Sequence, residues 1–505
     1  MRVRRLSDQE NKQSDRMART GVAGLDDILG GGLTRNRIYL MEGTPGSGKT
    51  TAAMQFLMAG AEAGETGLYI TLSESVEELQ ATATSHGWVL PDRLKVFELI
   101  PPEDLLDEQH QQSLLYSSDL ELGEATRMIF GAMEDTKPSR VVIDSLSEIR
   151  LLAGGSLRYR RQILALKHYF SRSGATVLML DDMTAEADDK TVHSVAHAVI
   201  RLEELAPVYG AERRRMRVIK YRGQPFRGGF HDFAIRHGGL IVFPRLVASE
   251  HRLDFKRDIL ASSVTQLDAL LGGGVARGSS TLVLGPAGAG KSLLVMEFVV
   301  AAIKRGEKAA MFIFDEELGL LFARAKAMGI DLAAMRDSGD LLIEQVDAAE
   351  LSPGEFTHKV RECVQARNLQ TIVIDSLNGY QAAMPEEQFL VLHMHELLTF
   401  LNRRGASTFL TVAQHGLVGD MKAPVDITYL ADTVILMRYF EASGRVRRAI
   451  SVIKKRTGSH EDTIREYVID GRGLTVGGAI EGFQGVLRGV PVYVGKSDFL
   501  LDERV

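Results

Sequence analysis

The sequence predicts two α/β domains in tandem, each with a mainly parallel central sheet that helices cover on both faces. Three observations predict this fold: a long internal repeat, an alternation of short apolar runs with helical stretches, and a glycine-rich loop after one apolar run of each copy. The chain has 505 residues, too many for one ordinary core, and its 45% hydrophobic and 25% charged residues are typical of a globular protein.

The internal repeat runs through most of the chain and keeps its order. TGVAGLDDILGGGL, residues 20–33, returns as SSVTQLDALLGGGV, residues 262–275, and RVVIDSLSEI, residues 140–149, returns as TIVIDSLNGY, residues 371–380. Self-similarity over this length indicates a duplicated domain. We expect a flexible arm, a first domain, a polar linker, a second domain and a short tail, at residues 1–17, 18–246, 247–258, 259–485 and 486–505.

Short β-branched runs alternate with longer amphipathic stretches in each copy. Residues 39–42 and 281–284 are apolar runs that lead into a glycine loop, and VVID, IVID, TVLMLDD and STFLTVAQ are also too short to be helices. Helical stretches such as RRQILALKHYFSRSG separate these runs. This alternation is typical of βαβ units, whose parallel sheet is buried on both faces.

Each copy carries a glycine loop of the form G-x-x-x-x-G-K-[ST], GTPGSGKT at residues 43–50 and GPAGAGKS at residues 285–292. Glycine lets backbone N–H groups turn around a phosphate where a Cβ would obstruct them, and the helix that follows directs its positive end at the same anion. A chance glycine loop is the alternative, but two loops at equivalent repeat positions argue against it. The pattern therefore predicts two ATP-binding sites.

The loop residues have specific expected roles. Lys49 and Lys291 would neutralise charge on the β- and γ-phosphates, and Thr50 and Ser292 would ligate Mg²⁺. The residues predicted to bind ATP here are Gly43, Thr44, Pro45, Gly46, Ser47, Gly48, Lys49, Thr50 and Thr51 in the first copy, and Gly285, Pro286, Ala287, Gly288, Ala289, Gly290, Lys291, Ser292 and Leu293 in the second.

Carboxylates at the ends of predicted strands complete each site. Asp144 and Asp375 each end an apolar run and precede Ser-Leu, which is the Walker B position beside the Mg²⁺ shell. Glu74 of TLSES, and Asp315 and Glu316 of IFDEE, end the strand after the loop helix, where an acid could activate the attacking water. For the two aspartates the alternative is a buried structural role. For the acids of TLSES and IFDEE the alternative is an N-cap, because a helical segment follows each of them.

These motifs, in two collinear copies, closely resemble the KaiC family of circadian-clock ATPases and autokinases in the RecA/DnaB superfamily. The resemblance implies tandem RecA-like domains and a double-ring homohexamer with ATP at the subunit interfaces of both rings. In such rings cations reach the nucleotide from the neighbouring subunit. The matching residues are Lys220 and Arg222 in KYRG, and Lys454 and Arg456 in KKRTG; solvated surface cations are the alternative.

The sequence departs from the family pattern in two places. The first-ring acidic pair is reduced, because Ser73 stands before Glu74. The family's adjacent Ser-Thr phosphorylation pair is matched by Thr428 and Tyr429. Thr428 keeps an aliphatic hydroxyl that suits phosphoryl acceptance, whereas the Tyr429 phenol sits on a longer arm. We therefore expect autokinase activity at Thr428 and no ordered two-site cycle.

Partners and location follow from the resemblance and the composition. We expect self-assembly and a KaiB-like partner, but no KaiA-type regulation, because the tail that ends at Val505 leaves little room for it. The single cysteine, Cys363, and the lack of any stretch of about 18 apolar residues predict a cytoplasmic protein without a membrane span. A net charge of −6 gives no overall basic field for nucleic acid.

The sequence favours an ATP-binding hexameric ATPase with serine/threonine autokinase activity in its second domain, acting in signalling or in clock- or stress-type regulation. Two other classes are compatible with the motifs. One is a RecA- or DnaB-like DNA-dependent ATPase, for which the basic run RRRMR at residues 213–217 is the nearest signal. The other is a signalling scaffold that nucleotide controls and that hydrolyses ATP slowly.

Overall fold

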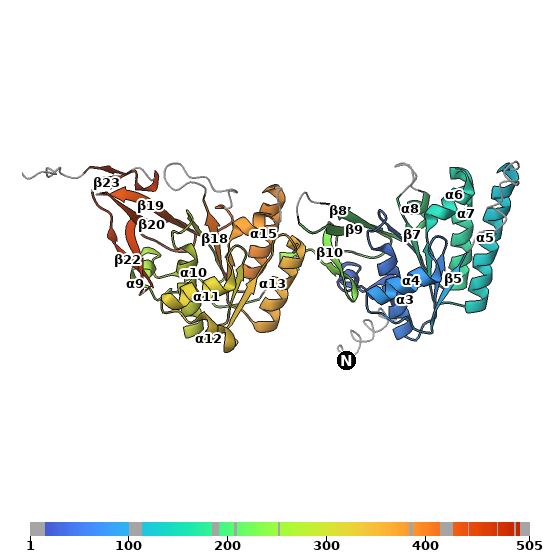
Figure 1. Cartoon of the computed structure of the whole chain (residues 1–505), viewed down its shortest axis with the longest axis horizontal. Coiled ribbons are helices and arrows are strands. Elements are labelled where there is room, and N and C mark those ends of the chain that lie inside the picture. The colour runs from blue at the N-terminus through green and yellow to red at the C-terminus, as the bar shows by residue number, and fades with distance from the viewer. Residues whose placement is uncertain are drawn as a thin grey trace, which may run out of the picture. The chain divides into compact units, whose positions relative to one another are not determined.

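The computed structural model describes residues 16–99, 114–183, 191–206, 210–250, 253–382, 387–414, 428–442, 444–471, 473–488 and 491–494. The chain divides into two compact units, Met1–Arg245 and Leu246–Val505 (Figure 1). Each unit is described by itself.

A nine-stranded sheet lies at the centre of the first unit, in the order β11-β10-β9-β8-β3-β7-β6-β4-β5 within the described residues. Its parallel part consists of β8 (Ala198–Leu205), β3 (Ile38–Glu42), β7 (Thr176–Asp181), β6 (Arg140–Asp144), β4 (Gly67–Thr71) and β5 (Leu94–Glu98). An antiparallel extension consists of β9 (Arg213–Tyr221), β10 (His231–Arg236) and β11 (Gly239–Phe243).

The second unit repeats this arrangement in the order β16-β15-β17-β18-β14-β19-β20-β21-β22. Its parallel strands are β16 (Leu341–Gln345), β15 (Ala309–Ile313), β17 (Thr371–Asp375), β18 (Ser407–Ala413), β14 (Ser280–Gly285) and β19 (Thr433–Ala442). The antiparallel extension is β20 (Arg445–Lys455), β21 (Arg465–Asp470) and β22 (Gly473–Ala479).

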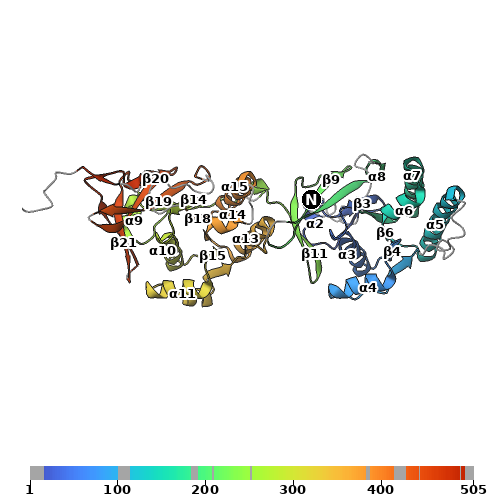
Figure 2. The same ribbon diagram turned by 45° about the horizontal axis from the view of Figure 1, so that its top comes forward.

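Helices cover both faces of each sheet, as Figure 2 shows for the first unit. One face packs against α2 (Leu25–Ile28), α3 (Lys49–Glu62) and α4 (Val76–Ser85), and the other against α5 (Leu114–Thr136), α6 (Leu146–Ala153) and α7 (Ser156–Ser173). The matching layers of the second unit are α9 (Thr265–Leu270), α10 (Lys291–Lys304), α11 (Leu318–Ala327) and α12 (Leu332–Asp337), and α13 (Pro353–Arg367), α14 (Leu377–Ala382) and α15 (Glu387–Arg403).

Burial on both faces explains why the predicted strands are apolar throughout. In β17, Ile372 and Ile374 pack into the cluster with α13 and α15, whereas Val373 packs into the cluster with α10. All three are fully buried. An alternating polar residue would place an unsatisfied group in one of the two cores. The predicted fold class, a mainly parallel sheet between helices in each half of the chain, is confirmed.

The repeated TG-x-x-x-LD and LGGG segments have a structural role. The backbone N–H and hydroxyl of Thr20 both donate to Asp26, at 2.9 and 2.8 Å, and Ser262 and Asp268 repeat these bonds. Gly32 has φ 123°, and a Cβ there would lie 2.5 Å from the carbonyl oxygen of Ala18, so the paired strands β1 (Met17–Ala18) and β2 (Leu33–Thr34) require glycine at this position.

The last residue of the predicted first domain and the predicted linker that follows it pack onto the second unit. Leu246 and Ala248 are buried in the cluster that contains α15. Leu253 N donates to Arg403 O at 3.0 Å, and the Phe255 ring fills the space over Gly405, where a Cβ would come within 2.7 Å of it. This segment is therefore held by side-chain packing as well as by hydrogen bonds. The domain bounds expected from the repeat stay a prediction.

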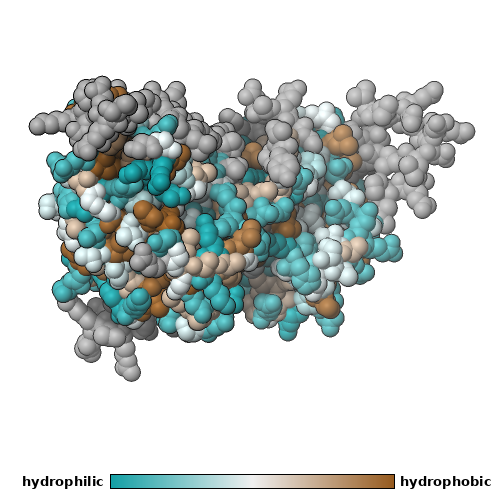
Figure 3. Space-filling model, turned by 60° about the vertical axis from the view of Figure 1, so that its left-hand side comes forward, coloured by the Kyte–Doolittle hydropathy of each residue, from teal (hydrophilic) through white to brown (hydrophobic). Residues whose placement is uncertain are grey.

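Hydrophobic side chains are scattered among hydrophilic ones on the face shown in Figure 3. In the part of the chain that the structure describes, none of the helices has both the length and the apolar character needed to cross a membrane.

Candidate functional site

The glycine loops join the central strand of each sheet to a buried helix. The first follows β3 and leads into α3, and the second follows β14 and leads into α10. Gly48 and Gly290, directly before these helices, have φ values of 96° and 94°. Other residues rarely adopt this left-handed conformation, so glycine is needed where the loop turns into the helix.

Both loop lysines are buried, and each donates hydrogen bonds to the backbone of its own loop. Lys49 Nζ donates to the carbonyl oxygens of Gly43 and Thr44, at 3.0 and 2.9 Å. Lys291 Nζ donates to the matching oxygens of Gly285 and Pro286, at 3.0 and 2.8 Å. Burial lowers the pKa of Lys291, and the charge of Asp375 partly offsets this. The two loops therefore bind their lysines through the same pair of carbonyl oxygens.

The first loop has features that fit a phosphate group. Among the described residues, the buried hydroxyl of Ser47 has no hydrogen-bond partner. Thr50 Oγ1 donates to Asp144 Oδ2 at 3.2 Å, which brings together the hydroxyl and carboxylate expected around Mg²⁺. The Thr50–Asp144 pair, directly after the loop, fits the oxygen ligands of a bound Mg·ATP.

The Walker B aspartates end the corresponding strands of the two units, but their hydrogen-bond partners differ. Asp144 ends β6 and accepts a hydrogen bond from Tyr69 OH at 2.5 Å. Burial raises the pKa of Asp144, which its hydrogen bonds partly offset. Asp375 ends β17 and accepts from Thr411 Oγ1 of β18. The two aspartates therefore hold matching positions in the backbone, but different side chains bond their carboxylates.

Glu74 lies beyond β4, on the same sheet edge as Asp144. Its Oε2 is buried and has no hydrogen-bond partner among the described residues. Burial raises the pKa of Glu74, and the charges of Asp144, Glu78 and Asp182 add to this. The helix-cap alternative does not hold for this residue, because Ser75 caps α4 and forms a capping box with Glu78.

Glu316 is matched to Glu74 but is differently paired. Its carboxylate lies 2.6 Å from Arg324 Nη2. Burial raises the pKa of Glu316, and Arg324 partly offsets this. Its neighbour Asp315 accepts a hydrogen bond from Ser376 Oγ. The next acid, Glu317, is the N-cap of α11 and accepts from the backbone N–H groups of Gly319 and Leu320, at 2.8 and 2.9 Å.

The four candidate trans cations lie at or just beyond the ends of β9 and β20. Lys220 Nζ donates to His193 O, and Arg222 Nη2 donates to Ser194 O at 2.7 Å. Lys454 Nζ donates to Thr428 O at 2.9 Å, and Arg456 Nη2 donates to Tyr429 O at 2.7 Å. The two units therefore place these cations alike, each on the backbone segment that precedes β8 or β19.

Burial lowers the pKa of Lys220, and the charges of Arg222 and Lys167 lower it further. An ammonium in this setting is stabilised by any anion that approaches it.

The candidate phosphoacceptors lie in the turn before β19. Thr428 is half-buried, whereas Tyr429 is exposed, with 53% of its surface accessible. The carbonyl oxygens of both residues accept hydrogen bonds from the cations described above. Residues 415–427 lie outside the described residues.

Several polar side chains at these sites do not belong to a recognised motif. They are Tyr69, which bonds Asp144; Thr411, which bonds Asp375; Gln414, whose buried Oε1 has no partner among the described residues; and Asp182, which pairs with Lys49. Asp182 and Gln414 follow the strands TVLMLD and STFLTVA at the sheet edge that bears the loops, so strand-end position is the signal that could have found them.

The basic run of β9 is neutralised by neighbours. Arg215 Nε lies 2.9 Å from Glu203, and Arg214 Nη2 lies 2.7 Å from Glu212. The guanidinium of Arg215 also stacks over the Phe230 ring, 4.0 Å from its centre. Paired arginines attract phosphate backbones less than free ones do, so this strand does not favour a nucleic-acid surface.

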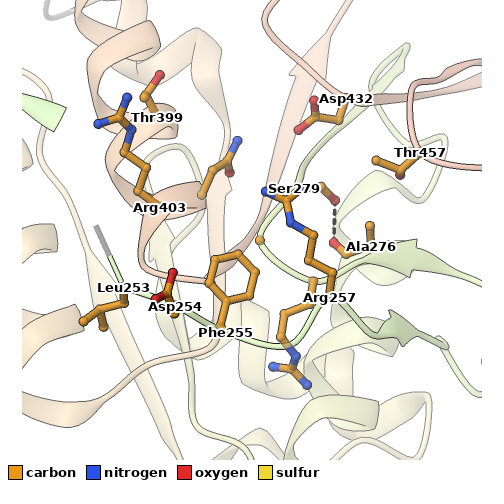
Figure 4. A pocket seen from close by; sticks show the side chains of 13 residues that line it. Leu253, Asp254, Phe255, Arg257, Ala276, Ser279, Thr399, Arg403, Asp432 and Thr457 are labelled. Carbon is orange, nitrogen blue, oxygen red and sulfur yellow. Dashed lines mark hydrogen bonds between the residues drawn. The ribbon is translucent and has the colours of Figure 1, made fainter. Parts of the chain in front are cut away.

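A cavity of about 540 Å³ in the second unit is separate from the glycine loop (Figure 4). Its wall includes residues 276–279, directly before β14, whereas the loop follows the other end of that strand. Ser279 Oγ donates to Ala276 O in this wall, at 2.6 Å. The cavity therefore lies away from the glycine loop of its own unit.

Known proteins resemble this chain over almost its whole length. The family model for the KaiC ATPase matches residues 18–247 and 260–480. The circadian clock protein KaiC3 of Synechocystis sp. is 28% identical over 512 residues, which cover 99% of this chain and 100% of that protein. The circadian clock oscillator protein KaiC of Thermostichus vulcanus is 29% identical over 482 residues, which cover 94% and 92%. The resemblance and the tandem RecA-like fold are confirmed, and the chain belongs to the KaiC ATPase family.

Proposed function

We propose that the chain is an ATPase that binds Mg·ATP in both domains, assembles as a double-ring homohexamer and phosphorylates itself at Thr428. The observation that carries the proposal is the repeated site: a loop lysine, a Walker B aspartate and a further acid converge at one edge of each sheet. The relatives' names, circadian clock proteins, favour a role in clock-type or related signalling. A KaiB-like partner is supported by the family resemblance alone.

Each domain would divide the chemistry among a few side chains. Lys49 or Lys291 would contact the phosphates, and Thr50 with Asp144, or Ser292 with Asp375, would hold Mg²⁺. When bound, the metal supplies charge that stabilises the transferred phosphoryl group. Glu74 would accept the proton of the attacking water in the first domain, and Glu316 would do so in the second. The orphaned Glu74 Oε2 leaves an acceptor free for that water.

The position of Arg222 supports completion of the site by a neighbouring subunit. Arg222 N donates to His197 O, and His197 N donates to Ile38 O, where β3 begins. The glycine loop lies beyond the other end of β3, five residues on, or roughly 16 Å away. Arg222 therefore lies at the opposite edge from its own loop, which supports a role at the nucleotide of another copy.

The autokinase proposal is tested by mass spectrometry of the full chain after incubation with ATP and Mg²⁺. We expect one added phosphate, on Thr428, and none on Tyr429. Native mass measured on the same sample should give six subunits. A chain that stays unmodified, or that carries phosphate only at other positions, would contradict the assignment of Thr428.

The pH dependence of the first domain tests the role of Glu74. The base must be ionised, and the pKa of Glu74 is raised above its ordinary value of 4.5 by burial and by nearby acids. Turnover should therefore fall as the pH drops through this raised pKa, and stay level above it. Phosphate release is measured in a chain with Lys291→Ala, so that the second domain is silent. Glu74→Gln should remove both the activity and its acidic limb.

A further inference from the structure

Asp182 lies just past the end of β7, beside the loop lysine of the first unit. Its Oδ1 is 2.9 Å from Lys49 Nζ, and its Oδ2 accepts a hydrogen bond from Ser145 Oγ at 3.0 Å. The Asp182 side chain is 27% exposed and that of Lys49 only 6%, so water screens the pair incompletely. These contacts make Asp182 a direct neighbour of the position where phosphate charge would be bound.

The ammonium of Lys49 is fully occupied in this arrangement. It contacts the carbonyl oxygens of Gly43 and Thr44 as well as Asp182, and a lysine ammonium has only three N–H donors. A phosphate oxygen must therefore displace one partner. Because Asp182 and the γ-phosphate are both anionic, each disfavours the other beside the same cation.

In the second unit the described position that matches Asp182 carries no carboxylate. Strand β7 aligns with β18 through their pairing with the central strands, Val177 opposite Ile38 and Thr408 opposite Ser280. This register matches Asp182 to Ala413, whose methyl group cannot pair with Lys291.

The serine that holds Asp182 also has an acidic partner in the second unit. Ser376, which matches Ser145, donates to Asp315, and Asp315 matches Ser73 of the first unit. In each site this serine therefore donates to one acid, but the acid follows a different strand in the two units. In the first unit that acid, Asp182, also contacts the loop lysine.

We propose that Asp182 competes with the γ-phosphate for Lys49 and so weakens ATP binding by the first domain. The inference rests on the proposed ATP site at this loop. Asp182 then has a positioning role: it pairs with Lys49 when no triphosphate is bound, and the pair separates when a triphosphate binds. ADP has no γ-phosphate, so its binding should respond less.

Calorimetric binding of a non-hydrolysable ATP analogue tests this in the full chain with Lys291→Ala, which leaves only the first site. Asp182→Asn keeps the size of the side chain and removes its charge. We expect on the order of tenfold tighter binding of the analogue, and a smaller change for ADP. Unchanged or weaker binding of the analogue would overturn the proposal. Asp182→Glu keeps the charge and should bind like the parent chain.

Two further variants distinguish an effect of contact with Lys49 from an effect of total charge. Asp182→Asn with Ser73→Asp restores the net charge but places the acid where the second domain has it, so binding should stay tight. A return to weak binding would show that total charge, not contact with Lys49, controls affinity. Ala413→Asp, in a chain with Lys49→Ala, should weaken binding by the second domain. If the Lys291→Ala chain binds no analogue at all, the proposed first site fails as well, whereas binding that Asp182→Asn does not tighten contradicts only the present inference.

Discussion

Replacing Arg222 with alanine is expected to lower ATP turnover by the first domain on the order of 10³-fold, because a cation delivered across a subunit interface stabilises the transferred phosphoryl charge. The side chain lies on the Ser194 carbonyl at the edge opposite its own loop, so its loss should leave that loop intact. Turnover is measured as phosphate release in a chain with Lys291→Ala. Binding of the ATP analogue should change far less than turnover.

Arg456→Ala in the same background is the matched control. Arg456 holds the corresponding place on the Tyr429 carbonyl of the second unit, so it should not affect first-domain turnover. If turnover survives Arg222→Ala, Arg222 is a solvated surface cation and has no role at the nucleotide site.

Replacing Glu316 with glutamine is expected to reduce second-domain turnover by roughly 10²–10⁴-fold, the usual contribution of a general base. Phosphorylation of Thr428 should be lost with it, because the same carboxylate would accept the hydroxyl proton. The measurement uses a chain with Lys49→Ala, with phosphate release and peptide mass spectrometry as readouts. Phosphate incorporation that survives Glu316→Gln would show that another group is the base.

Glu317→Gln separates this role from a structural one. Glu317 follows Glu316 directly, but it is fully exposed and its carboxylate caps α11. Losing the charge should weaken the cap of α11 slightly and leave turnover close to that of the parent chain. Equal losses for both variants would mean that α11, and not the carboxylate of Glu316, is what turnover requires.

The parts of the fold that sequence reasoning predicted are those that a local pattern encodes. The repeat, the apolar strands and the glycine loops each require particular residue types at fixed spacing, whatever surrounds them. The identity of the helix caps was not predictable in this way. Glu74, Ser75, Glu316 and Glu317 all stand at strand-to-helix junctions, and only the backbone conformation decides which side chain turns to the helix N–H groups.

Contacts between distant strands were also hidden in the sequence. Asp182 and Lys49 are far apart in the chain, and their pairing depends on β7 lying directly beside β3. The comparison of the sequence with the family pattern found a missing acid at Ser73. In the structure another acid, Asp182, accepts a hydrogen bond from Ser145, and no sequence motif specifies this contact.

Subunit mixing tests most directly whether each nucleotide site is completed by a neighbour. Two chains are prepared, both with Lys291→Ala: one also carries Lys49→Ala and the other Arg222→Ala. Each alone should be nearly inactive. After equal mixing and exchange, about one quarter of the interfaces in a ring should combine an intact loop with an intact arginine, so about one quarter of the first-domain turnover should return. No recovery, with exchange verified by native mass, would contradict a site shared between subunits.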